Sequence, residues 1–468
     1  MSLITSFFEF AKNLTLNGLG VERDLMQLIA DKDIGQVKTM FQDRDSEVAL
    51  AIKEYNPETH DVMSRENKRR KGKEPYIVQK LPRAWQRYIN EIALFFLLAK
   101  PIRWNCTNLD DTNSAAFEAF KNFLKSTRFD TTMRQSKRLA GAETESAKLY
   151  HIFRNEETNQ PEVKVVVLAK SESYTLRPLF DQYKNLKAFG YGYFLKEGTN
   201  SVEHFDIQTP KVIYRCSKQR LGWEVLPVTN PTGKINAIYY QQSKEWDGAG
   251  IRIARDEMVD SKAADVNEYF GDPVAKVSVD VFKSMVDPET VGKLVQMQGK
   301  DSVFEYVEPP TAPEMKESEK KVLKESILND SFTPDFSYES MKGTGTLSGE
   351  ALKRAMILGF IKRDNRKEIY DEMVIREKNL ILSIMMNVTH IGMKAQLESL
   401  NIEHEFSEPF DEDTDKRWTS IGRAYADGII SLETAVMLLS VAKPEEEIDK
   451  IKKAEEAART SSISEPTI

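Results

Sequence analysis

The chain has 468 residues, of which 40% are hydrophobic and 30% charged, and its formal net charge is −7. This length is too great for one simple core and predicts two to four folding units. The composition is typical of a globular protein and excludes a largely disordered one. The negative charge argues against a protein that wraps nucleic acid but allows one past which DNA slides.

Cysteine usage and hydropathy narrow the class further. Cys106 and Cys216 lie far apart and outside any cluster with metal-ligand spacing. They predict neither a disulfide framework nor a zinc site, and they favour a reducing compartment. The longest apolar run, residues 92–99, is too short to span a bilayer, and the N-terminus lacks the pattern of a signal peptide. We expect a chain made inside the cell, with no membrane partner.

The first 150 residues show helical periodicity in pieces. Residues 64–73 hold six basic residues in ten but no aromatic residue. This composition favours a solvated loop over a patch that binds DNA or a membrane. Residues 80–99 predict a strongly amphipathic helix that ends before Pro101, and a second helical block covers about 112–150.

The pattern changes to strands between residues 151 and 246. Short β-type runs alternate there with Gly, Pro, Asn and Asp, as at Asn230-Pro-Thr-Gly233. The sequence therefore predicts a small mixed or antiparallel β region on a helical base. The runs are Val163–Leu168, Tyr191–Leu195, Lys211–Tyr214 and Ile235–Tyr240.

Two helices are expected around a short β-like segment. Residues 250–270 predict a helix with an apolar stripe, and the β-like segment covers about 271–310. Thr311-Ala-Pro-Glu314 has the pattern of a capping box, which opens a highly charged helix to about Asn329. The stripe of the first helix consists of Val259, Ala263, Val266 and Phe270.

A Gly-, Ser- and Thr-rich loop over 335–346 precedes a long helical tract from 349 to about 388. Residues 362–368 hold no apolar side chain, so the tract either kinks there or leaves the core and becomes exposed. The C-terminal part, about 415–460, is helical again, with a helix start at Ser431-Leu-Glu-Thr434. We expect a disordered tail over 461–468.

Motif searches indicate no enzyme. Thr232-Gly-Lys234 lacks the earlier glycine and the Ser or Thr of a phosphate loop, and Gly190-Tyr-Gly192 lacks the third glycine of a dinucleotide fingerprint. The five histidines form no pair with ligand spacing. The acidic residues at 411–415 favour a solvated linker over a metal site, because no Gly-turned calcium loop surrounds them. We predict no catalytic residue, no cofactor and no metal.

The order of elements over 250–390 and three short motifs resemble the tailed-phage portal (head–tail connector) family, in its siphophage-type branch. The text at 327–336, followed by Gly343-Thr-Gly-Thr-Leu-Ser-Gly-Glu-Ala-Leu-Lys353, is similar to the family's loop and the head of its long helix. Residues 89–103 resemble its early helix, although Ala99-Lys100 replaces the usual Gly-Lys. Residues 428–449 resemble its C-terminal motif. The resemblance extends over about 50–460.

The resemblance implies an α+β, mainly helical subunit with wing, two-helix stem, small β-containing clip, tunnel loop with long helix, and helical crown. It assigns 1–249 to the wing, 250–270 and 313–329 to stem helices 1 and 2, and 271–312 to the clip. Residues 330–412 are assigned to the tunnel loop and long wing helix, and 413–460 to the crown. The family assembles as a twelve-fold ring in virions.

A tunnel loop at the narrowest part of a DNA channel is the implied site. Its expected residues are Ser340, Lys342, Gly343, Thr344, Gly345 and Thr346, and Lys342 supplies one weak, reversible DNA contact per subunit. Without the resemblance, Lys342 reads as a solvent-exposed loop lysine.

The implied function is a ring-shaped homo-oligomer at the capsid vertex, assembled in the host cytoplasm. It conducts double-stranded DNA during packaging and ejection. It also docks the terminase large subunit and a tail adaptor, and it contacts major capsid and scaffolding proteins. The alternatives are another head-assembly or scaffold protein without a DNA channel, and a terminase-type enzyme. The second needs a phosphate loop or a nuclease carboxylate cluster, which the sequence lacks.

Overall fold

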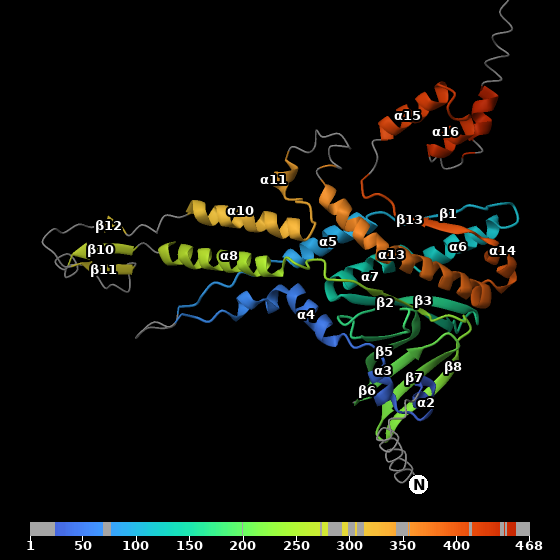
Figure 1. The fold of residues 1–468 in the computed structure, drawn as a ribbon, viewed down its shortest axis with the longest axis horizontal. Helices are drawn as coiled ribbons and strands as arrows, with labels where there is room; N and C mark the ends of the chain where they lie inside the picture. The colour runs from blue at the N-terminus through green and yellow to red at the C-terminus, as the bar shows by residue number, and fades with distance from the viewer. Residues whose placement is uncertain are drawn as a thin grey trace, which may run out of the picture. The chain divides into compact units, whose positions relative to one another are not determined.

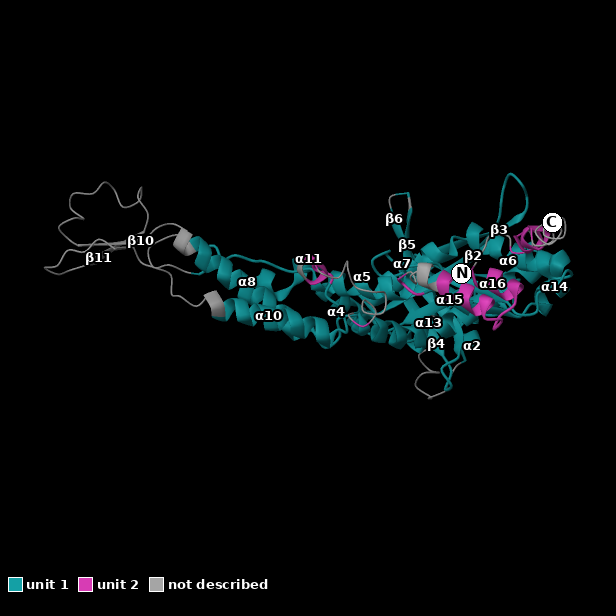
Figure 2. Ribbon diagram, turned by 90° about the horizontal axis from the view of Figure 1, so that it is seen from above, with its two compact units in different colours: residues 1–335, 356–407 teal, residues 336–355, 408–468 magenta. Residues whose placement is uncertain are grey.

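The computed structural model describes residues 24–68, 76–198, 200–271, 274–278, 293–297, 305–306, 313–342, 354, 356–410, 414–439, 444 and 447–454. The chain divides into two compact units (Figure 2). The first contains residues 1–335 and 356–407, and the second contains 336–355 and 408–468. The described elements are helices and mainly antiparallel strands, so the fold is α+β, as the sequence predicts.

A helical core lies at the centre of the first unit. Helices α5 (Trp85–Leu98), α6 (Ser114–Ser126), α7 (Phe129–Glu143) and α13 (Ile357–Ile384) bury Leu97, Phe120, Met133 and Ile381 in one cluster. The predicted helix over 80–99 is confirmed over residues 85–98 as α5, whereas residues 80–84 are not helical. Packing of the apolar faces of these helices, more than helix propensity, stabilises this layer.

The predicted helical block over 112–150 is wrong at its end. Arg128 and Thr144 adopt left-handed backbone conformations, with φ of 51° and 71°, and these positions separate α6 from α7 and end α7. A left-handed residue cannot continue a right-handed helix. The chain therefore enters strand β2 (Glu145–Arg154), whose first six residues are buried.

Two antiparallel sheets follow (Figure 1). The first has the order β3–β2–β9, and the second is a five-stranded meander, β4 to β8. The four predicted runs all overlap strands, which confirms an antiparallel β region. The strands that follow β2 in the two sheets are β3 (Pro161–Leu168), β4 (Thr175–Phe180), β5 (Leu186–Glu197), β6 (Asn200–Gln208), β7 (Val212–Gln219), β8 (Gly222–Thr229) and β9 (Ala237–Gln241).

Short helices of the N-terminal segment pack on the meander. Helices α2 (Leu25–Ala30) and α3 (Ile34–Met40) bury Leu28 and Val37 against Phe205 of β6. Helix α4 (Asp45–Tyr55) and the 3₁₀ turns Pro57–Thr59 and Asp61–Ser64 complete the segment.

The long helix α13 is continuous over residues 362–368. The predicted kink is therefore absent. The predicted exposure is confirmed for Asp364, Asn365, Lys367 and Glu368, but it fails at Lys362, which is buried and bonded within the core. The first residues of the predicted tract, 349–353, lie outside the described residues. A π-helical turn at Met385–Thr389, a 3₁₀ turn at Ile391–Met393 and α14 (Lys394–Ser399) follow α13. They lead to β13 (Ile402–Glu405), which pairs antiparallel with β1 (Arg103–Cys106).

Helices α8 (Gly250–Gly271) and α10 (Pro313–Asp330) lie side by side (Figures 1 and 2). Both predicted helices are confirmed, whereas Thr311 of the proposed capping box lies outside the described residues. Between them β10 (Val274–Ser278) pairs parallel with β11 (Lys293–Met297) and antiparallel with β12 (Glu305–Tyr306).

The described elements of the second unit are helices. It contains α11 (Tyr338–Met341), α15 (Thr414–Ala426), α16 (Leu432–Leu438) and helical residues at 447–454. The predicted helix start at Ser431 is confirmed, because the Ser431 side chain accepts a hydrogen bond from the Thr434 amide at 3.2 Å. This bond satisfies an amide that the first turn leaves free. The predicted tail, 461–468, lies outside the described residues.

Candidate functional sites

Helix α8 buries acidic side chains on the face that meets the segment before α5. Asp265 accepts from the Gln79 amide at 2.6 Å and pairs with Arg65 at 2.7 Å. Glu257 accepts from the Arg83 amide at 2.9 Å, and its carboxylate lies 2.6 Å from His60 Nδ1. The amides of Gln79 and Arg83 lie outside any sheet and donate instead to carboxylates of α8. These bonds hold the segment along α8.

This geometry corrects the expected apolar stripe of α8. Val259 is buried, Ala263 and Val266 are half-buried, and the side chain of Phe270 lies outside the description. Asp256, Glu257, Asp260 and Asp265 are all buried on the same helix. The buried face of α8 therefore consists largely of carboxylate side chains.

Ion pairs join α8 to α10. Arg252 pairs with Asp330 near one end, and Asp260 pairs with Lys320 further along. Arg255 binds Glu319 at 2.6 Å. The pairs Arg252–Asp330 and Asp260–Lys320 show that the two helices run antiparallel, so residues 271 and 313 lie at the same end of the pair.

The basic run at 64–73 is described only to residue 68. Arg65 is nearly buried and pairs with Asp265, and its guanidinium also donates to the Gln79 carbonyl. The expectation of a solvated loop therefore fails at Arg65, because the guanidinium of this residue is paired with a carboxylate of α8.

The predicted tunnel loop falls in the second unit and is only partly described. Ser340 is an exposed residue of α11, 3.2 Å from the Ser337 hydroxyl, and Lys342 follows the helix as an exposed residue. Gly343, Thr344, Gly345 and Thr346 lie outside the described residues. The tunnel-loop assignment stays a prediction.

A charged cluster lies beneath the first half of α13. The fully buried Glu245 carboxylate binds Lys137, lies 3.4 Å from Lys362 Nζ, and lies 3.1 Å from Arg366 Nε. Lys362 also donates to the carbonyls of Glu245 and Ser331 at 2.8 and 2.9 Å. Burial lowers the pKa of Lys362 to about 8, and the three cations hold the pKa of Glu245 well below its usual range despite burial.

A second buried carboxylate, Glu377, lies further along α13. It accepts hydrogen bonds from the Tyr150 and Tyr240 hydroxyls at 2.5 and 3.0 Å and lies 2.5 Å from Lys148 Nζ. Burial lowers the pKa of Lys148, although Glu377 opposes that shift. Glu377 thus fixes α13 against strands β2 and β9, and Glu245 fixes it against the segment between β9 and α8.

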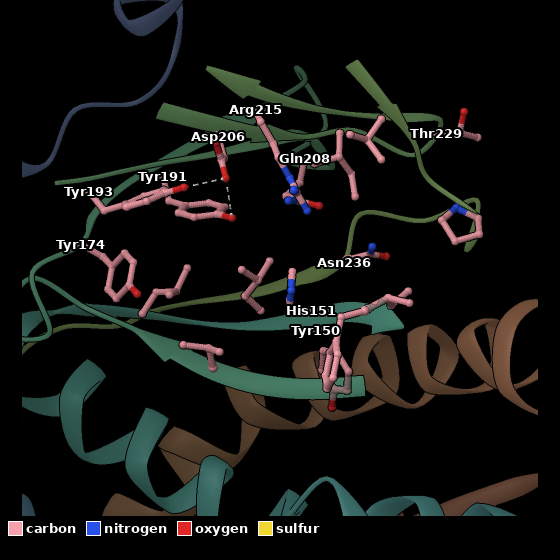
Figure 3. Close-up of a pocket in the computed structure, with 18 of the residues that line it drawn as sticks. Tyr150, His151, Tyr174, Tyr191, Tyr193, Asp206, Gln208, Arg215, Thr229 and Asn236 are labelled. Carbon is pink, nitrogen blue, oxygen red and sulfur yellow. Dashed lines mark hydrogen bonds between the residues drawn. The ribbon is translucent and has the colours of Figure 1, made fainter. Parts of the chain in front are cut away.

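The sheets enclose a cavity of about 630 Å³ between β5–β8 and the sheet β3–β2–β9 (Figure 3). Tyr191 and Tyr193, two residues apart on β5, donate to Asp206 of β6 at 3.1 and 3.2 Å. Burial raises the pKa of Asp206, although these phenols, the Arg215 charge and the Cys216 amide oppose the shift. Sequence reasoning placed Tyr191–Leu195 in a strand but did not identify this cavity.

The motifs rejected on sequence grounds have structural roles. Gly190 lies in β5, where an added Cβ would come 2.6 Å from the Phe205 ring, so close strand packing requires the glycine. Gly233 has a φ of +68° in a turn, and His404 lies 2.9 Å from Asp371. Among the described residues, no three His, Cys, Asp or Glu side chains form a metal-binding group. No helix in the described part of the chain has the length and apolar character needed to cross a membrane.

The fold and sites define an α+β subunit in which an antiparallel helix pair brackets the segment 272–312. The model of the family described as "Phage portal protein, SPP1 Gp6-like" matches residues 36–461. Since this match covers most of the chain, the chain belongs to the phage portal protein family, a structural and non-enzymatic family.

Other comparisons give less detail. A chain of the solved structure described as "Neck of native GTA particle computed with C12 symmetry" is similar with a TM-score of 0.41 and 9% identity. That similarity covers 76% of this chain and 90% of the other chain. A search of curated proteins returned no match.

Proposed function

We propose that the chain forms a ring at a capsid vertex and conducts double-stranded DNA during packaging and ejection. The observation that carries the proposal is the antiparallel pair α8–α10, which brackets a β-containing segment within a chain of the portal family. A head-to-tail contact that closes on itself produces such a ring.

Exposed apolar residues on this helix pair support assembly. Ile251 is 88% exposed, Met315 75% and Val322 57% in the single chain. Ile251 lies on α8, and Met315 and Val322 lie on α10. Exposed large apolar side chains gathered on one surface are typical of surfaces that a partner covers. In the proposed ring these residues contact the neighbouring copy.

The proposed architecture follows the sequence assignments. Residues 1–249 form the wing, α8 and α10 form the stem, and 271–312 form the clip. Residues 330–412 contain the tunnel loop and the long wing helix, and 413–460 form the crown. The buried carboxylates of α8 support a rigid stem, because they hold both α10 and the segment before α5.

Charge supports transit of DNA without tight binding. Twelve copies with a net charge of −7 each would give the ring a net charge of about −84. Tight phosphate binding depends on cations that release counterions, so a negative ring disfavours it. Exposed Lys342 at the head of the proposed loop supplies a weak contact from each subunit.

The proposed partners follow from the position at the vertex. The clip docks the terminase large subunit and later the tail adaptor, whereas the wing contacts major capsid and scaffolding proteins. The ring acts without catalysis and needs no cofactor.

A stem substitution tests assembly. Val322→Glu places a charge on an exposed position of α10, so the single chain should fold normally while the ring fails to close. Leu221→Glu, at a position 63% exposed in the β7–β8 turn, is the matched control and should form rings. Mass photometry and negative-stain microscopy read the outcome. Normal rings from Val322→Glu would exclude this face of the stem as the subunit interface, and wild-type protein that stays monomeric at all concentrations would refute the ring.

A further inference from the structure

We propose that the cavity between the two sheets of the first unit binds a small organic anion, a carboxylate or phosphate group attached to an aromatic ring. A free aromatic acid or a nucleotide can supply that chemistry. At about 630 Å³ the cavity has the size of a small-ligand site, and most of the side chains that line it are apolar or aromatic. The proposal does not depend on subunit assembly or DNA transit, because all its residues lie in one unit of one chain.

Two arginines supply the positive charge of the cavity lining. Arg154 is the last residue of β2, Arg215 lies on β7, and both side chains are exposed. Figure 3 shows Arg215 reaching into the cavity toward the facing strand β2. Among the described residues neither arginine forms an ion pair, and Arg154 donates only to the Asn159 side-chain oxygen at 3.4 Å. Both guanidinium groups therefore keep donors that match the oxygens of a carboxylate or phosphate.

The single carboxylate in the cavity lining is shielded from a ligand. Asp206 is 5% exposed, accepts hydrogen bonds from the Tyr191 and Tyr193 hydroxyls, and is also bonded by the Cys216 amide. Its Oδ1 is buried as well. Burial raises the pKa of Asp206, which favours the neutral form. Even when Asp206 is ionised, two arginines oppose one carboxylate, so the lining keeps a net positive charge.

The electrostatic potential at His151 also indicates a site for an anion. This histidine lines the cavity from β2, and burial together with the charges of Arg215 and Lys164 lowers its pKa. Lys164 is exposed and lies directly across from His151 on β3. A cleft with charge of one sign concentrates ions of the opposite sign. The potential that disfavours an imidazolium at this position therefore favours a bound anion.

Aromatic side chains beside the arginines favour a ligand that carries a ring. His151 and Phe153, two residues apart on β2, are stacked with centroids 5.9 Å apart and an interplanar angle of 12°. Phe153 is 37% exposed, so part of its surface is open to a ligand. Tyr174 and Tyr193 line the same cavity with centroids 5.9 Å apart. Because aromatic groups pack well against each other, an anion with a ring should bind more tightly than the same anion without one.

The test is a calorimetric titration of the full chain with phenyl phosphate and with benzoate. Inorganic phosphate lacks the ring, benzyl alcohol lacks the charge, and benzylammonium reverses it. We expect at least one of the two aromatic anions to bind, inorganic phosphate to bind about tenfold more weakly, and the other two compounds not to bind. Adenosine monophosphate distinguishes the sources, because tighter binding than phenyl phosphate indicates a nucleotide and weaker binding indicates a simpler aromatic acid.

Substitutions at exposed positions complete the test. Arg154→Gln and Arg215→Gln each remove one guanidinium and should weaken binding of the aromatic anion about tenfold. Phe153→Leu should weaken it several-fold and leave inorganic phosphate binding unchanged. Arg220→Gln is the matched control, because Arg220 is exposed just after β7 but outside the cavity lining, and it should change nothing.

Urea unfolding midpoints of these variants should match wild type, since none of the substituted side chains is buried. Absence of aromatic anion binding to wild type, equal affinity for inorganic phosphate, or equal losses from Arg215→Gln and Arg220→Gln would overturn the proposal.

Discussion

Replacing Glu245 with glutamine tests how α13 is held in the first unit. The Glu245 side chain is completely buried and shares its carboxylate among Lys137, Lys362 and Arg366, whose side chains are 0%, 7% and 14% exposed. Glutamine has nearly the same shape, so Glu245→Gln removes charge without opening a cavity. Three cations then remain in a buried site without their counter-charge.

The expected loss of stability is large for a single isosteric change. Breaking a buried ion pair by removing one partner costs about 3–5 kcal/mol, because the remaining charge is left uncompensated. Adding Lys362→Met to Glu245→Gln removes one surplus cation. The double variant should therefore be more stable than Glu245→Gln alone, with a coupling of about 0.5–3 kcal/mol.

The assay is urea unfolding followed by circular dichroism. Glu203→Gln is the matched control, because Glu203 pairs with Lys38 and Lys218 in a more exposed site, 26% exposed. Exposed pairs contribute at most about 1 kcal/mol. If Glu245→Gln costs no more than Glu203→Gln, water or another group compensates the cations and this account of the cluster is wrong.

Other substitutions and conditions test neighbouring features. The pKa of Lys362 is about 8 in the folded chain, against an ordinary value of 10.5, so the unfolded chain binds more protons between these values. Stability should therefore rise as the pH increases from about 8 to 10.5, and Lys362→Met should abolish that component in urea midpoints measured across this range. Gly359→Ala should lower the free energy of unfolding by about 1–3 kcal/mol, because its Cβ would lie 2.3 Å from the Phe96 ring. Gly422→Ala in α15, where an added Cβ meets nothing within 4 Å, should instead raise the unfolding midpoint slightly. Glu377→Gln should destabilise the chain by about 3–5 kcal/mol in the same assay, and a loss below 1 kcal/mol would show that its carboxylate is not the anchor of the second half of α13.

Local patterns in the sequence predict the positions of several helices, although not always the face that each helix buries. Helix α5, the pair α8 and α10, and the start at Ser431 all follow from local patterns. The block over 112–150 fails at Thr144, because a non-glycine residue in a left-handed conformation leaves no clear local signal. Long-range strand pairing of β2 with β9 then decides the structure there.

The buried charges could not be predicted from local sequence. Residues 362–368 lack apolar side chains and so indicate exposure, yet Lys362 binds a carboxylate 117 residues away in sequence. The cavity could not be predicted either. The spacing of Tyr191 and Tyr193 places them on one face of a strand, but only the register of β5 with β6 brings Asp206 next to them. Both sites depend on contacts between distant segments, which no motif or period encodes.

Deleting residues 340–346 tests the proposed tunnel loop apart from assembly. The deletion should leave rings intact but reduce DNA packaging or retention in heads. Unchanged packaging and retention would mean that this segment lies away from the channel.

Electron microscopy of the purified full chain tests the central proposal most directly. We expect closed rings with a central hole wide enough for double-stranded DNA, lined in part by α8 and α10. Closed particles without a hole, or monomers and small dimers at every concentration, would contradict it.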